Sequence, residues 1–327
     1  MTQTTTLPDR VRGFPFPFAA DTYRYSTNIE PARAVRTTEA GGWGATIVDV
    51  DGDYRDELAE RARILARDPT RCIVLPHMRV AAWDTLLLGL QELALARPGQ
   101  MRLRRERNGA WHWVNELAEV EQRFVFGDDD TLPCEPLRFV GDQLQEDLVL
   151  LDQREQQLFA DAGLVTFAAD WSLGFDVGMS FLEVHGPVPR IHVEGIIPRA
   201  QQFLLRLQLG HPYRRTNWTM TVDRRLDTAT ETYPEWGPDR SQVVLGDDVG
   251  ARLHLRVEVQ HLVRLAESGA VLFVIRSYLL SLRELALVEP WRRRTAEVLD
   301  ELPQDLVDYK GITRFRSAAV DWLRAAA

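Results

Sequence analysis

Histidine is the residue type of this chain best suited to chemistry at neutral pH, because its ordinary pKa is about 6.5 and its neutral ring binds metals. The chain has seven histidines among 327 residues. His185 and His192 lie on either side of a Pro-Val-Pro corner in FLEVHGPVPRIHVEG, residues 181–195. Prolines restrict the backbone beside them, so the corner fixes the position of the His185 ring. No two histidines have the i, i+4 spacing of a helical zinc site.

A haem group needs fewer protein ligands than a zinc ion does. One proximal imidazole, an apolar slot and cations for two propionates are sufficient. The sequence offers His185 as the imidazole, the apolar faces of residues 253–282 as the slot, and four arginines as the cations: Arg214, Arg215, Arg256 and Arg276. The alternative for His185 is a buried ring that is only hydrogen-bonded within the core.

Motifs of other enzyme classes are absent from the sequence. It contains no Gly-x-Gly-x-x-Gly segment, no phosphate-binding loop and no Gly-x-Ser-x-Gly elbow. The acidic runs 128–130 and 247–248 lack the spacing of a calcium loop and are typical of solvated turns. The two cysteines, Cys72 and Cys134, make neither a disulfide framework nor a Cys-x-x-Cys metal site.

Hydrophobic periodicity predicts the elements that would position these residues. Residues 253–265 alternate, so one buried strand face carries His261 between Val259 and Val263. Glu-Ser-Gly closes a hairpin into 270–280, an almost wholly apolar strand that we expect at the centre of a sheet. The other expected elements are a strand over 214–226, a hairpin around Asn108-Gly109, one short helix capped by Ser172, and helices at 53–68, 81–99, 197–210 and from 289 onward.

These elements predict an α+β chain, in which an antiparallel sheet with helices on one side forms a cup able to hold a flat cofactor. We expect three parts. Residues 1–134 form an N-terminal α/β region packed on the core, 135–288 form the core, and 289–327 form C-terminal helices.

Composition is that of a globular protein, with 45% hydrophobic and 27% charged residues. The formal net charge of −9 disfavours nucleic acid or an anionic membrane surface as a partner. The start, MTQTTTLPDRVRG, has no apolar segment typical of a secretory signal, and the apolar stretch 270–282 is too short to cross a bilayer. We therefore expect a cytoplasmic protein that binds neither nucleic acid nor membrane.

Five segments occur in an order that resembles the haem-dependent oxidative N-demethylase alpha-subunit family, whose core is a PAS-like haem domain. They are LQEDLVLL (144–151), ADWSLGFDVGMSFLEVHGPVP (169–189), YRRTNWTM (213–220), LRVEVQHLVRLAESGAVLFVIRSYLLSL (255–282) and DYKGI (308–312). The resemblance implies a PAS-like antiparallel sheet whose flanking helices form a haem pocket, with N-terminal and C-terminal helical elaborations.

The resemblance also implies roles for single residues. His185 matches the histidine of the family's Pro-Val-Pro corner and would be the proximal ligand of a haem b iron. Arg214 or Arg276 would pair with a propionate. Family positions are also matched by Asn217, Trp218, Glu258, Gln260, Arg276 and Tyr278. Of these, Asn217, Trp218 and Tyr278 are expected to contact haem, with plain core packing as the alternative for Trp218 and Tyr278.

The chain also departs from the family pattern. Phe175 and Asp176 stand where the family carries a basic segment, and Arg190 replaces a glycine. VEVQH (257–261) replaces the Val-Glu-Arg-Gln pattern, so an arginine is lost and His261 is gained. His261, if distal to the iron, would hydrogen-bond oxygen or relay a proton as a catalytic group. These changes leave haem binding in place and put the substrate in question.

The implied function is a haem-dependent monooxygenase that uses O2 to oxidise a small amine, by N-demethylation or a related oxidation at nitrogen or carbon. A separate flavin and iron–sulfur reductase would supply the electrons. The alternative is a non-catalytic PAS-like haem sensor of gas or redox state, although we find no coiled coil or output domain in the sequence. A third reading is a scaffold without cofactor, in which His185 is merely buried. The amine, a second axial ligand and a homo-oligomer are left open.

Overall fold

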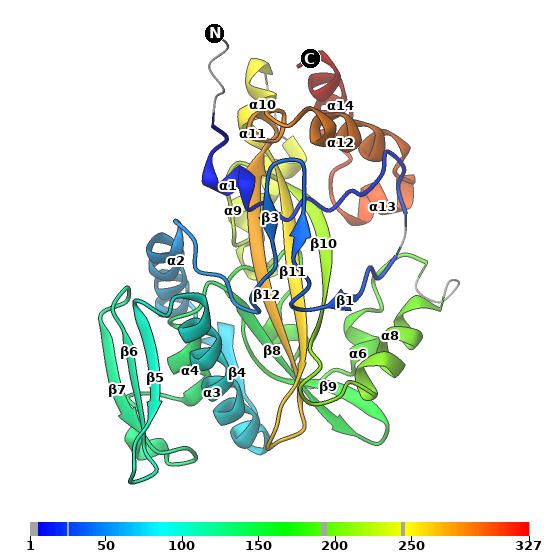
Figure 1. The fold of residues 1–327 in the computed structure, drawn as a ribbon. Coiled ribbons are helices and arrows are strands. Elements are labelled where there is room, and N and C mark those ends of the chain that lie inside the picture. The colour runs from blue at the N-terminus through cyan, green and yellow to red at the C-terminus, as the bar shows by residue number, and fades with distance from the viewer. Residues whose placement is uncertain (1–5, 25, 191–194, 243–245, 327) are drawn as a thin grey trace.

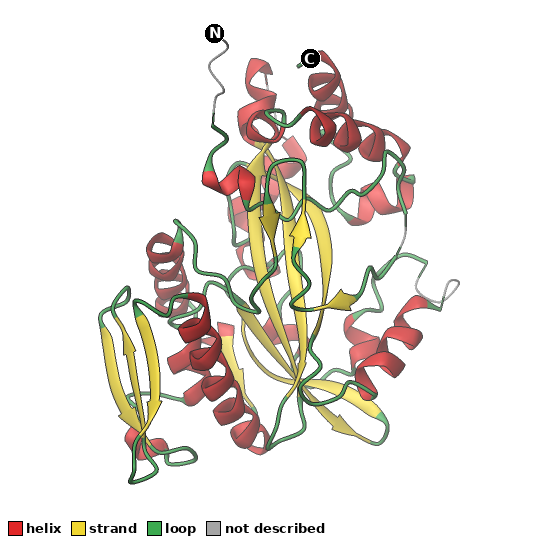
Figure 2. Ribbon diagram, in the orientation of Figure 1, coloured by secondary structure: helices red, strands yellow, loops and turns green. Residues whose placement is uncertain are grey.

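The structure, a computed structural model, describes residues 6–24, 26–190, 195–242 and 246–326 (Figure 1). Within them the fold is mixed α and β, with antiparallel sheets surrounded by helices, as the sequence predicts (Figure 2). None of the described helices is both long and apolar enough to span a bilayer.

A large sheet of seven strands forms the centre of the molecule, and each neighbouring pair is antiparallel. In spatial order the strands are β1 (Glu30–Pro31), β10 (Tyr213–Val222), β11 (Leu253–Arg264), β12 (Val271–Ser281), β8 (Asp147–Arg154), β9 (Gln157–Leu164) and β4 (Cys72–Val74). The β11–β12 hairpin is confirmed, with Gly269 at φ +69° in its turn. The predicted central position of β12 is also confirmed, because it lies between β11 and β8.

One face of the large sheet is covered by N-terminal elements, drawn in blue and cyan at the lower left of Figure 1. The helices there are α2 (Tyr54–Arg67), α3 (Arg79–Ala96) and α4 (Pro136–Gly141), beside a small sheet of β5 (Met101–Arg105), β6 (Trp111–Asn115) and β7 (Val120–Phe124). Trp83 and Leu86 of α3 share a hydrophobic core with Leu272 and Val274 of β12. The hairpin around Asn108-Gly109 is confirmed, whereas its third strand, β7, was not predicted.

Helices from the second half of the chain gather at one end of the sheet, together with the start of the chain (Figure 1). They are α10 (Val249–Arg252), α11 (Leu282–Leu285), α12 (Glu289–Glu301), α13 (Gln304–Tyr309) and α14 (Arg316–Ala325), with α1 (Asp9–Arg12) nearby. The predicted helical character from residue 289 onward is confirmed. Trp291 stacks on Phe16 with ring centroids 4.7 Å apart, so the N-terminal arm packs against α12.

The short helices α5 (Leu173–Asp176), α6 (Phe181–Val184) and α8 (Ile196–Leu205) lie against β9, and α9 (Tyr233–Gln242) lies against β10. Figure 1 shows α6 and α8 at its lower right. The sequence predicted one helix after Ser172, and the structure has two. Ser172 caps α5 by accepting a hydrogen bond from the Phe175 amide, as predicted. Gly178, at φ +89°, separates the two helices, and Ser180 starts α6 with a capping box.

Two further features complete the described fold. A two-stranded sheet pairs β2 (Arg36–Thr37) with β3 (Gly42–Trp43) in the N-terminal arm. The helix predicted at 197–210 ends earlier, at Leu205. The division into residues 1–134, 135–288 and 289–327 stays a prediction.

Candidate functional site

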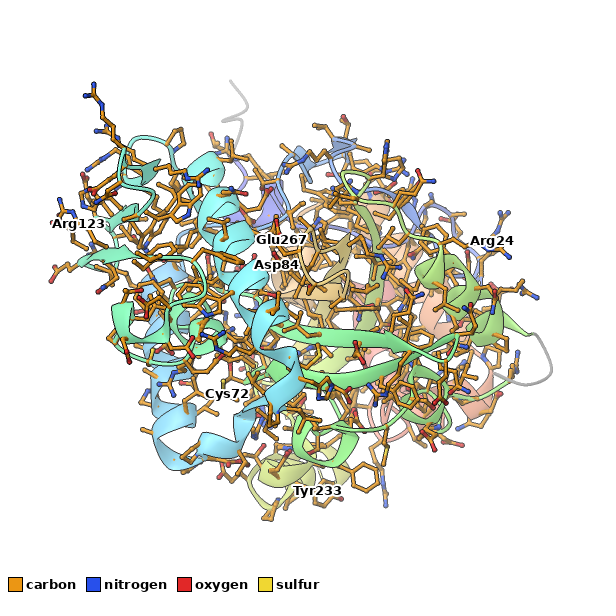
Figure 3. The ribbon with its side chains drawn as sticks, turned by 90° about the horizontal axis from the view of Figure 1, so that it is seen from below. Arg24, Cys72, Asp84, Arg123, Tyr233 and Glu267 are labelled. Atoms are coloured by element: carbon orange, nitrogen blue, oxygen red, sulfur yellow. The ribbon has the colours of Figure 1, made fainter. Side chains whose placement is uncertain are left out.

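A cavity of about 990 Å³ lies between the large sheet and the segments that cover it. This volume is at the upper end of the range of about 300–1,000 Å³ typical of ligand pockets. Its walls come from the strands β8 to β12, the helices α5, α6 and α8, the arm segment 17–29, and the helices α12 and α13. Arg24, from the arm, is at the periphery of the molecule in Figure 3, opposite the small sheet that carries Arg123. All three predicted parts of the chain therefore contribute to one cavity.

His185 lines this cavity from the end of α6. Its Nδ1 lies 2.8 Å from the carbonyl oxygen of Phe181. Because a carbonyl only accepts hydrogen bonds, Nδ1 is the protonated nitrogen and Nε2 keeps its lone pair. Among the described residues, none hydrogen-bonds to Nε2. The Phe181 ring also packs on the imidazole, with centroids 4.2 Å apart, so the ring is held in one orientation.

The protonation state of His185 follows from its surroundings. Burial lowers the pKa of His185 to about 4, and the positive charge of Arg215 acts in the same direction. The hydrogen bond to Phe181 opposes this shift without cancelling it. The ring is therefore neutral at physiological pH, which is the form that binds a metal.

Apolar side chains surround the His185 end of the cavity. Those on the sheet and on the helices face one another across it: Val149, Leu151, Ala160, Leu262, Phe273, Phe181, Val184, Ile197, Ala200, Phe203 and Leu204. Most belong to a single hydrophobic cluster between the sheet and α6–α8. An apolar slot of this kind excludes water from whatever binds next to the imidazole.

A chain of polar side chains crosses the sheet wall of the same cavity. Arg215 donates to Oε1 of Gln260 at 3.0 Å, and the Gln260 amide donates to Oε2 of Glu258 at 3.0 Å. The other oxygen of Glu258 accepts from buried Arg256 at 3.3 Å. Arg215 also donates to the carbonyl oxygen of Thr27, which ties the arm to the cavity rim. Glu258 and Gln260 of β11 thus present their polar groups to the cavity.

Lys310 reaches the cavity from the end of α13. Its ammonium donates to the carbonyl oxygen of Trp218 at 2.6 Å and lies 4.4 Å from the centroid of the indole ring. Burial and the charge of Arg215 lower the pKa of Lys310 to about 8, while Glu258 opposes the shift. Lys310 therefore keeps most of its positive charge at neutral pH.

Two other predicted haem contacts, Asn217 and Trp218, also line the cavity. Trp218 meets Phe18 of the arm edge to face, with centroids 5.0 Å apart. His185, Asn217 and Trp218 are thus brought to one cavity, as the sequence analysis expected of haem contacts. His192 lies outside the described residues.

Arg214 is on the opposite face of β10 from the cavity, which differs from its predicted place beside a propionate. Its fully buried guanidinium donates to the Glu30 carboxylate at 2.8 Å and to the carbonyl oxygens of Ala32, Ala34 and Gly44. It also lies 4.3 Å from the centroid of the Trp43 ring. Arg214 therefore holds the N-terminal arm on the sheet.

Arg276 and Tyr278 are also outside the set of cavity-lining residues, because they project from β12 toward the N-terminal region. Arg276 bonds Asp51 at 2.7 Å and Glu57 at 2.8 Å, and the Tyr278 hydroxyl donates to Asp49 at 2.9 Å. These acids already neutralise the arginine, so the structure differs from the predicted propionate and haem contacts.

The Gln-Glu-Asp motif of residues 145–147 belongs to the same buried network. Gln145 donates to Asp51 and Glu57, and Glu146 accepts from the Asp49 amide at 2.8 Å. Burial raises the pKa of Glu146 to about 7. The motif therefore joins the core to the N-terminal segment.

His261 is buried, as its place on the alternating strand predicted. It faces Arg214 and Arg33 instead of the cavity, so the structure does not bring it near His185 as a distal catalytic group. Neither ring nitrogen has a hydrogen-bond partner among the described residues. Burial lowers the pKa of His261 to about 3, and both arginines reinforce the shift.

Several charged residues of the cavity, among them Arg215, Lys310 and Asp176, were not selected as site residues from the sequence. Arg215 was one of four candidate cations, and its alternation with Arg214 along a strand was the signal that the two point in opposite directions. Lys310 was visible only as part of DYKGI. Asp176 was noted only as a departure from the family pattern.

A protein-family model described as "Haem-dependent oxidative N-demethylase, alpha subunit-like" matches residues 42–320. The match includes every strand of the large sheet except β1, together with α5 to α13 and most of the cavity-lining residues. It also contains the five ordered segments on which the resemblance was based.

Proposed function

We propose a function from the premise that this chain belongs to the haem-dependent oxidative N-demethylase alpha subunit-like family. The cavity would hold haem b, with His185 as the protein ligand of its iron, and the holoprotein would be a monooxygenase for a small amine. In this proposal the large sheet and its flanking helices are the PAS-like haem-binding fold.

The observation that carries the proposal is the hydrogen bond from Nδ1 of His185 to the Phe181 carbonyl oxygen. Metal-binding histidines commonly donate their other ring nitrogen in this way, which fixes the tautomer and the ring orientation. The neutral state of the ring and the free lone pair of Nε2 at the cavity wall support the same role. The donor set therefore fits a haem iron.

The rest of the cavity also fits haem. Its facing apolar walls suit the porphyrin, and Arg215 and Lys310 are the cations that would pair with propionates. Arg215 lines the cavity and donates to Gln260 and Thr27. Lys310 donates to the neutral carbonyl oxygen of Trp218, and a propionate would give its ammonium a charged acceptor.

When bound, haem supplies the activation of dioxygen, with two electrons from outside the chain. The chain's own residues have simpler tasks. His185 keeps its proton on Nδ1 and offers Nε2 to the iron, while the apolar walls exclude water. Lys310 holds a proton on Nζ at neutral pH and adds positive charge beside Trp218.

We further propose that a separate flavin and iron–sulfur reductase supplies the electrons, in the cytoplasm. The description of the matching family as an alpha subunit supports a partner protein. A haem sensor of gas or redox state would use the same axial ligand, so only turnover separates the two functions.

The test is the absorption spectrum of protein expressed with haem available. We expect a Soret band in the wild type and in His211→Ala, whose exposed side chain is not among the cavity-lining residues. His185→Ala should lose the band, and added imidazole should restore it. Amine-dependent formaldehyde release with reductase and oxygen then supports the enzyme, whereas a haem protein without turnover supports the sensor. A colourless wild type, or an unchanged spectrum in His185→Ala, would refute the ligand assignment.

A further inference from the structure

Asp176 is a carboxylate at the cavity wall without a protein partner. It is the last residue of α5, and only 9% of its surface is exposed. Its side chain makes no hydrogen bond or ion pair with any residue in the described part of the chain. Burial raises the pKa of Asp176 to about 6, and the negative charge of Glu231 adds to the effect.

Other buried acids of this protein have partners. Asp147 pairs with Arg61 and accepts the amides of Thr166 and Phe167, and Glu57 pairs with Arg276. A buried carboxylate is costly unless it is paired or hydrogen-bonded, so folded proteins seldom keep one unpaired. The arrangement at Asp176 therefore indicates that its partner is a ligand.

Arg215 and Lys310 do not pair with this carboxylate. Arg215 bonds Gln260 and affects the pKa of His185, while Lys310 bonds Trp218. Asp170, which lines the same wall, differs from Asp176 because Arg240 pairs with it. The cavity thus combines Arg215, whose positive charge acts on His185, with a carboxylate on α5 that has no partner among the described residues.

The surroundings of Asp176 suit an organic cation. Trp171 also lines the cavity from the segment before α5, and an indole ring binds ammonium ions through its π face. Leu173 and Val149 add apolar surface and pack with Trp171 in one cluster. Aromatic and apolar surfaces with one carboxylate recognise methylated ammonium groups, whose charge is spread over methyl hydrogens.

We propose that Asp176 and Trp171 form a subsite for a methylated ammonium group, which makes the cavity selective for cationic amines over neutral molecules of the same shape. This inference rests on the proposed function, because it places the substrate's ammonium group in the haem-binding cavity. Asp176 is the specificity-determining residue of the subsite. Its carboxylate binds the ammonium, and Trp171 covers the methyl groups.

The test is calorimetric titration of the purified holoprotein with tetramethylammonium, and with tert-butanol as a neutral probe of similar shape. The wild type should bind the cation and discriminate against the alcohol. Asp176→Asn keeps the size of the side chain and removes its charge. We expect it to weaken cation binding roughly 10- to 100-fold, as for a lost charge-assisted contact, and to leave alcohol binding unchanged.

Asp170→Asn is the matched control, because its carboxylate lies on the same wall and already has Arg240 as its partner. It should keep the wild-type cation affinity. Equal cation affinity in Asp176→Asn and the wild type would overturn the subsite, and so would loss of the Soret band in Asp176→Asn. A wild type without haem that still binds the cation through Asp176 would refute the proposed function and leave the subsite standing.

Discussion

The two adjacent arginines of β10 allow a strict test of which face of the sheet binds the cofactor. Arg214 and Arg215 project to opposite faces of the strand, one toward the N-terminal arm and one toward the cavity. Arg214→Met and Arg215→Met each remove one guanidinium and keep an unbranched side chain. The two variants have the same change of charge, so any difference between them comes from position.

The expected loss of stability is large for Arg214→Met. The guanidinium is fully buried and bonds the Glu30 carboxylate and three carbonyl oxygens. Breaking one side of a buried ion pair costs about 3–5 kcal/mol when the other charge is left without a partner. Glu30 keeps Arg36 as a partner, so the loss expected here comes mainly from the three carbonyl oxygens that lose their donor, at about 1–3 kcal/mol for each buried acceptor left unsatisfied. Arg215 is half-buried, and it donates hydrogen bonds to the uncharged oxygens of Thr27 and Gln260. Its removal should therefore cost about 1.5–3 kcal/mol.

Haem affinity should follow the opposite order. If Arg215 pairs with a propionate, Arg215→Met loses a contact of about 1.5–3 kcal/mol, which is a weakening of roughly 10- to 150-fold. Arg214 does not line the cavity, so Arg214→Met should bind haem within about threefold of the wild type wherever it remains folded.

Urea denaturation of the haem-free proteins and spectroscopic titration with haem measure the two quantities separately. The reasoning fails if Arg214→Met is as stable as the wild type, since the arm would then not depend on this side chain. It also fails if Arg214→Met, still folded, loses haem affinity while Arg215→Met keeps it. That result would assign the propionate to the other face of β10.

Three further predictions concern single residues. His261 is neutral in the folded protein and takes up a proton when the protein unfolds below about pH 6.5, so the fold loses stability as the pH falls toward about 3. At pH 5 this loss is about 2 kcal/mol. Urea denaturation should therefore show a smaller loss of stability between pH 7 and pH 5 for His261→Leu than for the wild type. An unchanged loss would show that His261 is not buried in its neutral form. Gly44 has φ +89° and lies against the Arg214 guanidinium, so Gly44→Ala should lower the free energy of unfolding by at least about 1–2 kcal/mol, whereas Gly52→Ala, with open space around it, should not. Lys310 loses its positive charge above about pH 8. Spectroscopic titration should therefore show that the haem affinity of the wild type falls between about pH 7 and pH 9. A similar fall in Lys310→Met would exclude Lys310 as a propionate partner.

The sequence predicted the parts of the fold that depend on local pattern. Period-two alternation identified β11, and the Gly-containing turn followed by an apolar segment identified its hairpin partner β12. Two strand patterns joined by a short turn are compatible with few structures other than a hairpin. The capping role of Ser172 followed in the same way from its position before a helical segment. The third strand of the small sheet was missed, because Val120–Phe124 contains charged residues and only a short apolar pattern.

Contacts between distant segments were beyond local pattern. Lys310 meets Trp218 across 92 residues, and Asn28 docks the arm by hydrogen bonds with Thr216, 188 residues away. No periodicity within either segment specifies such a pairing. The cavity therefore depends on contacts that the sequence does not reveal segment by segment, although His185, selected from the sequence, is among its lining residues.

The division of polar residues between the two faces of the sheet was nevertheless within reach once strand pairing is known. In the antiparallel register of β10 and β11, Asn217 is opposite Glu258, Arg215 is opposite Gln260, and Arg214 is opposite His261. Side chains directly opposite each other share a face. Placing Asn217 at the cavity therefore places Glu258, Arg215 and Gln260 there too, and it places Arg214 and His261 on the other side. Alternation within one strand did not supply the register between the strands. Without that register, His185 and His261 were predicted to lie in one pocket, whereas His185 lines the cavity and His261 lies on the opposite face of the sheet.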